Sequence, residues 1–209
     1  IRAYYFYQFD VFTNSVDEVR RISGLGHLIG YHYDVLDNNN GNIKLAINEF
    51  RENLNFFQNF GFKIFWICPH GNPTLKRKNW YSNKDFFRSN LVRSSFPLLK
   101  DIVVDKEIHF PFYKYISDAG YGFKIINSVS DNDCISSQDE EVNILQFLKD
   151  NIEESLIISM HSHRWCSNIF LFKYKKFLFV FLKSFYHLTK SIPIMNIFYN
   201  ITFKYARKF

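Results

Sequence analysis

The sequence predicts an α/β fold built around a parallel sheet or barrel. Three observations support this prediction. Segments with helical apolar spacing alternate with short apolar runs, the first five segments follow the order β-α-β-α-β, and 209 residues suffice for one domain with a sizeable core. The composition, 47% hydrophobic and 22% charged, is that of a globular protein.

The chain opens with a strand and a helix. Residues 1–9 are rich in Tyr and Phe, which favour a strand. Ser15 and Glu18 form a capping-box pattern at the start of a helix, and Gly24 marks the end of that helix. A second strand is expected over residues 28–33.

The most regular helix of the sequence comes next. Residues 43–57 carry a single apolar stripe at three- and four-residue spacing, and Gly61 ends the pattern. Residues 63–68 form a short apolar run, which is typical of a strand buried on both faces. Between residues 69 and 111 the aromatic side chains indicate only packed loops or short helices.

The second half of the chain repeats the alternation less clearly. Strands are expected over residues 112–117, 123–126 and 156–160. Ser137 and Glu140 form a second capping-box pattern ahead of a helix.

The chain is expected to have two parts. Residues 1–168 would form the barrel, and residues 169–209 a basic, aromatic, helical tail. The net charge of the whole chain is +6, yet the segment from Lys173 to Phe209 holds eight Lys or Arg and no Asp or Glu, so the remainder is slightly acidic. The tail either packs as a terminal helix with its lysines in water or lies on an anionic membrane surface.

Several function classes are disfavoured by composition. A nucleic-acid-binding protein needs a basic face on its folded domain, and the sequence shows no such pattern. Cys68, Cys134 and Cys166 are too few and too widely spaced for a disulfide framework, which favours reduced thiols in the cytoplasm. No apolar run approaches the roughly 20 residues of a membrane span. We therefore expect a cytoplasmic protein, with peripheral contact to the inner membrane face as the alternative that the tail suggests.

Polar side chains follow four of the expected strands. His32 and Asp34 lie at the end of the second strand, His70 follows the third, and Asp118 and His161 follow two later ones. The carboxyl ends of parallel strands meet on one face of a barrel, where active sites are built. The set therefore predicts a cluster of metal ligands and acid/base groups.

Four motifs resemble those of the NodB-type polysaccharide deacetylases, which form carbohydrate esterase family four. The similarity is greatest to the WbmS-like branch found with surface-polysaccharide synthesis. It covers about residues 1–165 and rests on residues 25–34 (LGHLIGYHYD), 68–73 (CPHGNP), 117–120 (SDAG) and 160–165 (MHSHRW). The resemblance implies a distorted (β/α) barrel and a divalent metal, usually zinc. It also implies hydrolysis of an N-acyl group on an amino sugar in surface glycan biosynthesis.

The resemblance also implies roles for individual residues. His32 matches the first metal-binding histidine, and Asp34 or His70 would supply a further ligand. His161 matches the histidine that protonates the leaving amine. Asp118 either orients a catalytic group or caps a turn.

The remaining candidates would contact the substrate. The backbone N–H of Gly71 can approach an oxyanion, and Asn72 lies next to it. His163 and Arg164 would hold an anionic substrate group, or Arg164 stacks on Trp165 as a structural pair. His70 either binds the metal or orders its loop.

The sequence departs from the family pattern at three places. The aspartate pair on the opening strand of the family has no counterpart, because the chain begins at what resembles the second strand; we expect upstream residues to be missing. Leu36 occupies the position of the second metal-binding histidine, and Pro69 to Asn72 replace a motif that usually carries an Arg and an aromatic residue.

Two rival functions follow from these departures. One is a catalytically inactive, truncated barrel that binds carbohydrate through Trp80 and Trp165. The other is a membrane-surface scaffold that works through the basic tail. A barrel that lacks a strand exposes two sheet edges, so either marginal stability or an oligomer is also expected.

Overall fold

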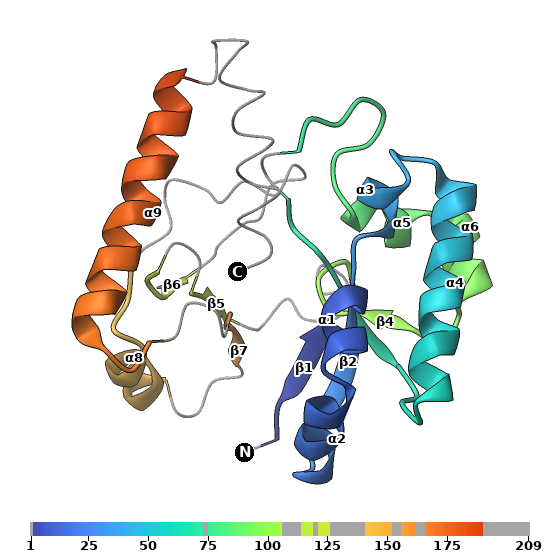
Figure 1. Ribbon diagram of the computed structural model, residues 1–209, viewed down its shortest axis with the longest axis horizontal. Coiled ribbons are helices and arrows are strands. Elements are labelled where there is room, and N and C mark those ends of the chain that lie inside the picture. The colour runs from blue at the N-terminus through green and yellow to red at the C-terminus, as the bar shows by residue number, and fades with distance from the viewer. Residues whose placement is uncertain are drawn as a thin grey trace. The chain divides into compact units, whose positions relative to one another are not determined.

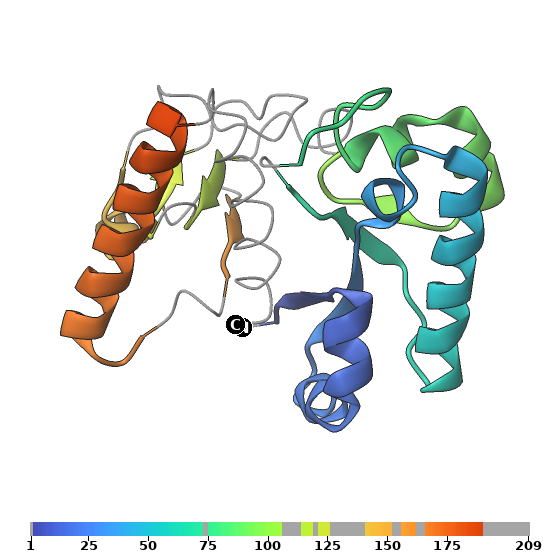
Figure 2. The same cartoon turned by 45° about the horizontal axis from the view of Figure 1, so that its top comes forward.

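The computed structural model of the protein describes residues 2–72, 75–105, 114–118, 121–125, 141–151, 156–161 and 166–189. The chain divides into two compact units, which are considered one at a time. Both combine helices with parallel strand pairs, so the α/β class predicted from the sequence is confirmed (Figures 1 and 2).

The first unit is built on a four-stranded parallel sheet. The strands are β1 (Tyr4–Tyr7), β2 (Leu28–Tyr33), β3 (Trp66–Pro69) and β4 (Lys100–Asp101), in the order β1-β2-β3-β4. The helices are α1 (Phe9–Asn14), α2 (Val16–Gly24), α3 (Val35–Asn38), α4 (Ile43–Asn59), α5 (Lys84–Arg88) and α6 (Asn90–Ser95).

The second unit contains a smaller mixed sheet. Its strands are β5 (Lys114–Ser117), β6 (Lys124–Ile125) and β7 (Leu156–Ser159), in the order β6-β5-β7. β5 pairs with β7 in parallel and with β6 antiparallel. Two helices complete the described part of this unit, α8 (Ile144–Asp150) and α9 (Ile169–Thr189).

The closed barrel expected from the sequence is not seen among the described residues. Their strands form two open sheets, each with two edge strands. Closure of a barrel requires every strand to have a hydrogen-bonded neighbour on both sides. Within the described ranges, β1 and β4 each pair with one strand of the larger sheet.

The predicted start of α2 is correct in position, but the capping-box hydrogen bonds are not formed. Ser15 is the N-cap residue, yet its side chain makes no capping hydrogen bond. Glu18 instead receives two hydrogen bonds from the Arg21 guanidinium, at 2.6 and 3.0 Å. The short helix α1, which the sequence analysis did not predict, directly precedes this N-cap.

The long helix α4 confirms the clearest sequence pattern. Asn42 caps its N-terminus by accepting hydrogen bonds from the backbone N–H groups of Lys44 and Leu45. The predicted apolar stripe is buried along most of its length. Past the end of the helix, Gly61 adopts a φ of 89° and the chain turns toward β3.

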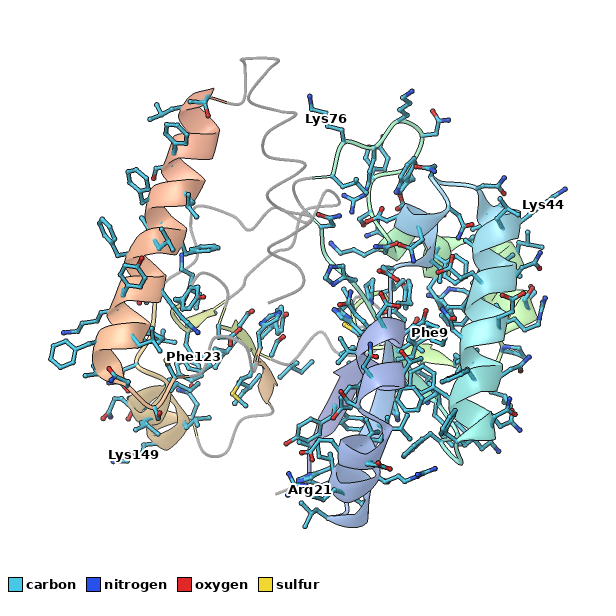
Figure 3. All side chains as sticks on the ribbon, viewed as in Figure 1. Phe9, Arg21, Lys44, Lys76, Phe123 and Lys149 are labelled. Carbon is cyan, nitrogen blue, oxygen red and sulfur yellow. The ribbon has the colours of Figure 1, made fainter. Side chains whose placement is uncertain are left out.

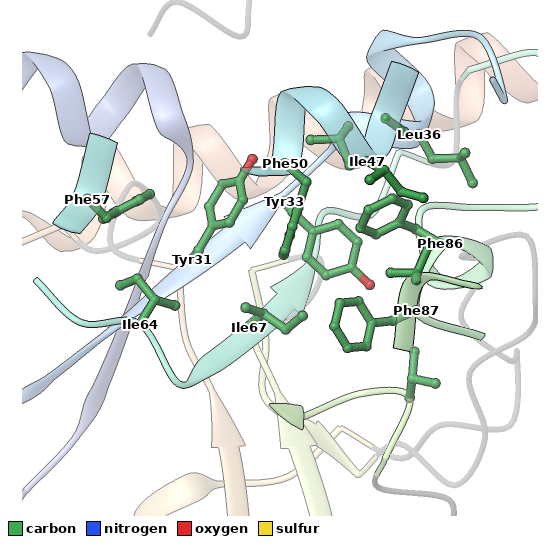
Figure 4. Packing of buried hydrophobic residues seen from close by; sticks show 14 of the residues in the cluster. Tyr31, Tyr33, Leu36, Ile47, Phe50, Phe57, Ile64, Ile67, Phe86 and Phe87 are labelled. Carbon is green, nitrogen blue, oxygen red and sulfur yellow. The ribbon is translucent and has the colours of Figure 1, made fainter. Parts of the chain in front are cut away.

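The core of the first unit is mainly aromatic. Tyr31 and Tyr33 of β2 are completely buried against Phe50 of α4, and Phe86 and Phe87 of α5 complete the cluster (Figure 4). Packed loops or short helices were expected between residues 69 and 111; the described part of this stretch holds α5 and α6, and also the short strand β4. Side chains on one face of β2 are therefore held in the core, which leaves the other face for His32.

The second unit contains the two helices that close the described chain. α8 is capped by the Asn143 side chain, which accepts from the N–H groups of Leu145 and Gln146. The capping box predicted at Ser137 and Glu140 lies outside the described residues. α9 lies at the start of the helical tail expected over residues 169–209. Of the helices described, none has the length and apolar character needed to span a membrane.

Candidate functional site

Two predicted histidines meet at the carboxyl ends of neighbouring strands in the first unit. His32 precedes the last residue of β2, and His70 follows the last residue of β3. The parallel register pairs His32 with Cys68, and the backbone N–H of His70 donates to the Tyr33 carbonyl at 2.7 Å. His70 Nδ1 consequently lies 3.1 Å from His32 Nε2, with the two rings nearly perpendicular.

The hydrogen bonds of this pair assign the proton on each ring. His32 Nδ1 lies 3.1 Å from the Cys68 carbonyl oxygen, which can only accept, so His32 carries a proton on Nδ1. With both rings neutral, His32 Nε2 is the acceptor and His70 Nδ1 donates to it. A backbone carbonyl on one ring nitrogen is the arrangement that orients many metal-binding histidines through the other nitrogen.

The spacing of the two nitrogens fits a shared metal ion. Two nitrogen ligands of a tetrahedral zinc ion, each about 2.0–2.1 Å from the metal, lie about 3.3 Å apart. The 3.1 Å between His32 Nε2 and His70 Nδ1 is close to that value. Metal binding through both nitrogens would transfer the proton of His70 from Nδ1 to Nε2.

The third predicted ligand does not join the pair in this structure. Asp34 is the N-cap residue of α3, and its Oδ1 accepts a hydrogen bond from the Asn38 side chain at 3.1 Å. Over the described ranges of the chain, no cluster of three or more His, Cys, Asp and Glu residues is suited to holding a metal ion. Two histidines therefore lie together here, whereas catalytic zinc sites ordinarily have three protein ligands.

The two predicted substrate contacts of the first unit directly follow His70. Gly71 is exposed, whereas Asn72 is largely buried, with 9% of its surface exposed. The backbone carbonyl of Asn72 accepts from the N–H of Leu75 and begins the next turn of the loop. Gly71 therefore presents an accessible backbone beside the histidine pair, as the oxyanion role requires.

A buried polar network that the sequence analysis missed fixes the loop of His70. Asp37 of α3 receives two hydrogen bonds of 2.7 Å from the Arg77 guanidinium and one of 2.7 Å from the Trp80 indole N–H. Asn83 donates both to Asp37 and to the His70 carbonyl oxygen. Arg77 and Asp37 are 6% and 7% exposed, so this ion pair is shielded from solvent.

This network also gives Trp80 a structural role. Its ring packs against Gly41 and the hydrophobic core, and its indole N–H points at Asp37. The carbohydrate contact expected of Trp80 in the inactive-barrel interpretation therefore finds no support in its surroundings. The sequence signal that could have revealed the network is the clustering of Arg77, Trp80 and Asn83 within seven residues.

A second missed group is the carboxylate of Asp101, at the end of β4. Asp101 is completely buried and accepts hydrogen bonds from the Tyr33 hydroxyl at 2.6 Å and from the N–H groups of Val103 and Val104 at 2.9 Å. Burial raises the pKa of Asp101 to about 6 despite these donors. The sequence offers one clue, an aspartate close to a run of apolar residues.

The thiol of Cys68, on β3, has a raised pKa. Burial is the main cause of the increase, and the negative charge of Asp101 adds to it, while Lys84 opposes it. A raised pKa disfavours the thiolate, which is the form of cysteine that acts as nucleophile and metal ligand.

The second unit holds a separate carboxylate–histidine pair. Asp118 follows β5 and His161 lies two residues past β7, which pairs with β5 in parallel through Ser117 and Ser159. Both the ring Nδ1 and the backbone N–H of His161 contact the Asp118 carboxylate, at 2.5 and 2.8 Å. Asp118 is 4% exposed and its side chain is anchored, so of its two predicted roles the geometry matches that of an orienting group.

This pairing selects one tautomer of His161. An ionised carboxylate only accepts, so Nδ1 of His161 carries the proton in this contact. The side chain of His161 is 40% exposed, and that of Asp118 only 6%. The pair thus combines a shielded carboxylate with a histidine that solvent and solutes can reach. His163, Arg164 and Trp165, predicted to contact substrate, lie outside the described residues.

The chain was compared with known protein families, curated proteins and solved structures. No family model, no curated protein and no solved structure matches the chain.

Proposed function

We propose that the protein is a metal-dependent hydrolase that removes an N-acyl group from an amino sugar in surface glycan biosynthesis, as the polysaccharide deacetylases do. The observation that carries the proposal is the histidine pair, in which His32 Nε2 and His70 Nδ1 lie 3.1 Å apart. The closed, distorted barrel of that family stays part of this proposal.

The first unit would hold the metal, with zinc the preferred ion. His32 is oriented for this by the Cys68 carbonyl, and His70 by the network around Asp37 and Asn83. Asp34, two residues after His32, is the candidate third ligand once its contact with Asn38 is given up. A bound divalent metal supplies Lewis acidity and lowers the pKa of a water ligand.

In the second unit, the Asp118–His161 pair is the candidate for proton transfer. His161 protonates the leaving amine through Nε2, and Asp118 keeps the ring in the required tautomer and orientation. In the first unit, the Gly71 N–H would stabilise the negative charge that develops on the acyl oxygen.

The proposal is tested by measuring zinc per chain and acetate release together. The intact protein is expected to bind zinc near stoichiometrically and to release acetate from an N-acetylglucosamine oligosaccharide or nucleotide sugar. His32→Ala and His70→Ala should each lower zinc affinity by at least about tenfold and abolish release. Asp34→Asn should lower affinity as well.

The matched control is His27→Ala. His27 lies just before β2, where its Nδ1 accepts from the backbone N–H of Ala3, and it belongs to neither pair. This variant should keep both zinc and activity. Zinc binding that survives His32→Ala and His70→Ala alike would remove the metal site from the first unit and with it the proposed function.

A further inference from the structure

One face of α9 is aromatic and exposed along the length of the helix. Six side chains at helical spacing form this stripe, namely Phe170, Tyr174, Phe177, Phe181, Phe185 and Leu188, and their exposures are 79%, 61%, 67%, 54%, 39% and 80%. The rings of Phe177, Phe181 and Phe185 stack in succession at 6.3 Å between centroids. With about 1.5 Å of rise per residue, the stripe is about 27 Å long.

The opposite face of α9 is the one that packs on the second unit. Phe172 and Phe179 contact the ring of Tyr121, and Lys176 forms an ion pair of 2.8 Å with Glu141. The hydrogen bond from Lys176 lowers the pKa of Glu141. The orientation of the helix is therefore set by contacts on the other side, and the stripe faces away from them (Figure 3).

Three properties of the helix identify its partner by chemistry. Leu171, Leu178, Val180 and Leu182 are also exposed, so the apolar surface spreads well beyond a narrow seam. A protein groove takes a stripe about 100° wide, whereas a flat hydrocarbon boundary accommodates a broad face. The helix contains four lysines and no acidic residue, and Lys173 lies exposed one turn from Phe177.

We propose that α9 docks the protein onto an anionic membrane surface. The stripe is immersed at the boundary between headgroups and acyl chains, with the helix parallel to the surface. Lysines such as Lys173 reach back to the lipid phosphates, and the further basic residues that follow in the sequence, without an acidic one, add to the attraction. The proposal stands independently of the proposed enzymatic function.

Vesicle sedimentation of the full chain tests this proposal. Vesicles of phosphatidylcholine alone are compared with an equimolar mixture of phosphatidylcholine and phosphatidylglycerol. Binding to the mixed vesicles should be at least about tenfold tighter and should weaken at high salt, because exposed charges are screened. The double variant Phe177→Ser/Phe181→Ser should lose at least about tenfold in affinity, and Lys173→Glu about fivefold or more.

Matched controls lie on the first unit. Tyr81 and Leu98 are as exposed as the stripe, at 69% and 74%, and Lys44 is an exposed lysine on α4. Tyr81→Ser/Leu98→Ser and Lys44→Glu should bind vesicles as the intact chain does. Equal binding by the α9 variants, or no binding of the intact chain to mixed vesicles, would overturn the proposal.

Light scattering of the same proteins tests the alternative that the stripe binds a second copy of the chain. A concentration-dependent dimer that the double variant abolishes, together with absent vesicle binding, would assign the stripe to self-association instead. Circular dichroism of each variant checks that α9 is retained. A monomer that sediments with anionic vesicles supports membrane docking.

Discussion

Ionisation of the buried Asp101 carboxylate is expected to affect the stability of the first unit. Asp101 is fully buried, and its pKa of about 6 lies above the value near 3.9 that an aspartate has in an unfolded chain. Between these two values the folded protein retains a proton that the unfolded chain has lost. Stability is therefore fully present below the unfolded pKa, is lost as pH rises through about 6, and is constant above.

Asp101→Asn should remove this pH dependence. The amide keeps an oxygen for the N–H groups of Val103 and Val104 but cannot ionise. Urea unfolding between about pH 4 and 7 should show the wild type losing up to about 3 kcal/mol relative to the variant. Asp17→Asn, at a side chain that is 98% exposed, should show no such trend. A difference in unfolding free energy between the wild type and Asp101→Asn that stays constant with pH would contradict the burial argument.

The connection between α3 and α4 depends on a glycine. Gly41 has a φ of 81°, which side chains disfavour, and a methyl group at this position would overlap the ring of Trp80. The close approach lets Trp80 reach Asp37 and places Asn42 as the N-cap of α4. Gly41 therefore affects two features of the first unit. These are the N-cap of α4, its longest helix, and the polar network that holds the loop of His70.

Gly41→Ala should lower the free energy of unfolding by about 2–4 kcal/mol, because a strained φ and an overpacked ring both contribute. Gly24→Ala is the matched control. Gly24 ends α2 with no positive φ and no atom within 4 Å of an added methyl group, so the variant should be as stable as the wild type or slightly more so. Thermal unfolding measures both, and similar Tm values for the two variants would show that the turn tolerates a side chain.

At the scale of the whole molecule, the candidate chemistry is divided between two units. The histidine pair belongs to the first and the Asp118–His161 pair to the second, each formed at the ends of adjacent parallel strands. The charge is divided as well, since the basic residues from Lys173 to Phe209 exceed the net charge of the chain. Membrane docking rests on the second unit alone.

The variant His161→Ala should separate the loss of acetate release from zinc binding and vesicle binding. Acetate release should fall by about 10²–10⁴-fold, the usual contribution of a general acid, while bound zinc and vesicle binding stay at wild-type levels. Asp118→Asn should lose part of the same activity because the ring of His161 is no longer held. Unchanged turnover in His161→Ala would remove the general-acid assignment.

Helices and strands were predicted most accurately where their apolar periodicity is most regular. α4 and β2 were predicted within two residues of their observed ends, since each has a long, unambiguous periodicity. The ends of β1 and β3 were less accurate, because a short apolar run does not show where its hydrogen-bonded partner stops. The six-residue α1 was missed, since its sequence lacks a full helical repeat.

Some features of the candidate site could be predicted from the sequence and others could not. His32, His70, Asp118 and His161 could be selected because each follows a predicted strand, and strand ends are where parallel sheets gather polar groups. Which of them meet could not be predicted: His32 joins His70 rather than Asp34, and His161 joins Asp118. The buried carboxylates and guanidinium of the first unit had only a weak sequence signal, because burial of a charge depends on the partners that folding brings to it.

The sequence by itself determined the α/β class, the principal helices and strands, and the residues able to carry chemistry, because these follow from local periodicity and residue type. Tertiary structure alone decided the pairing of the histidines, the tautomers of His32 and His161, the raised pKa of Asp101 and the exposure of the α9 stripe. The physical reason is distance along the chain. Each of these properties depends on atoms contributed by segments that are far apart in sequence, and only packing sets their separation and their access to water.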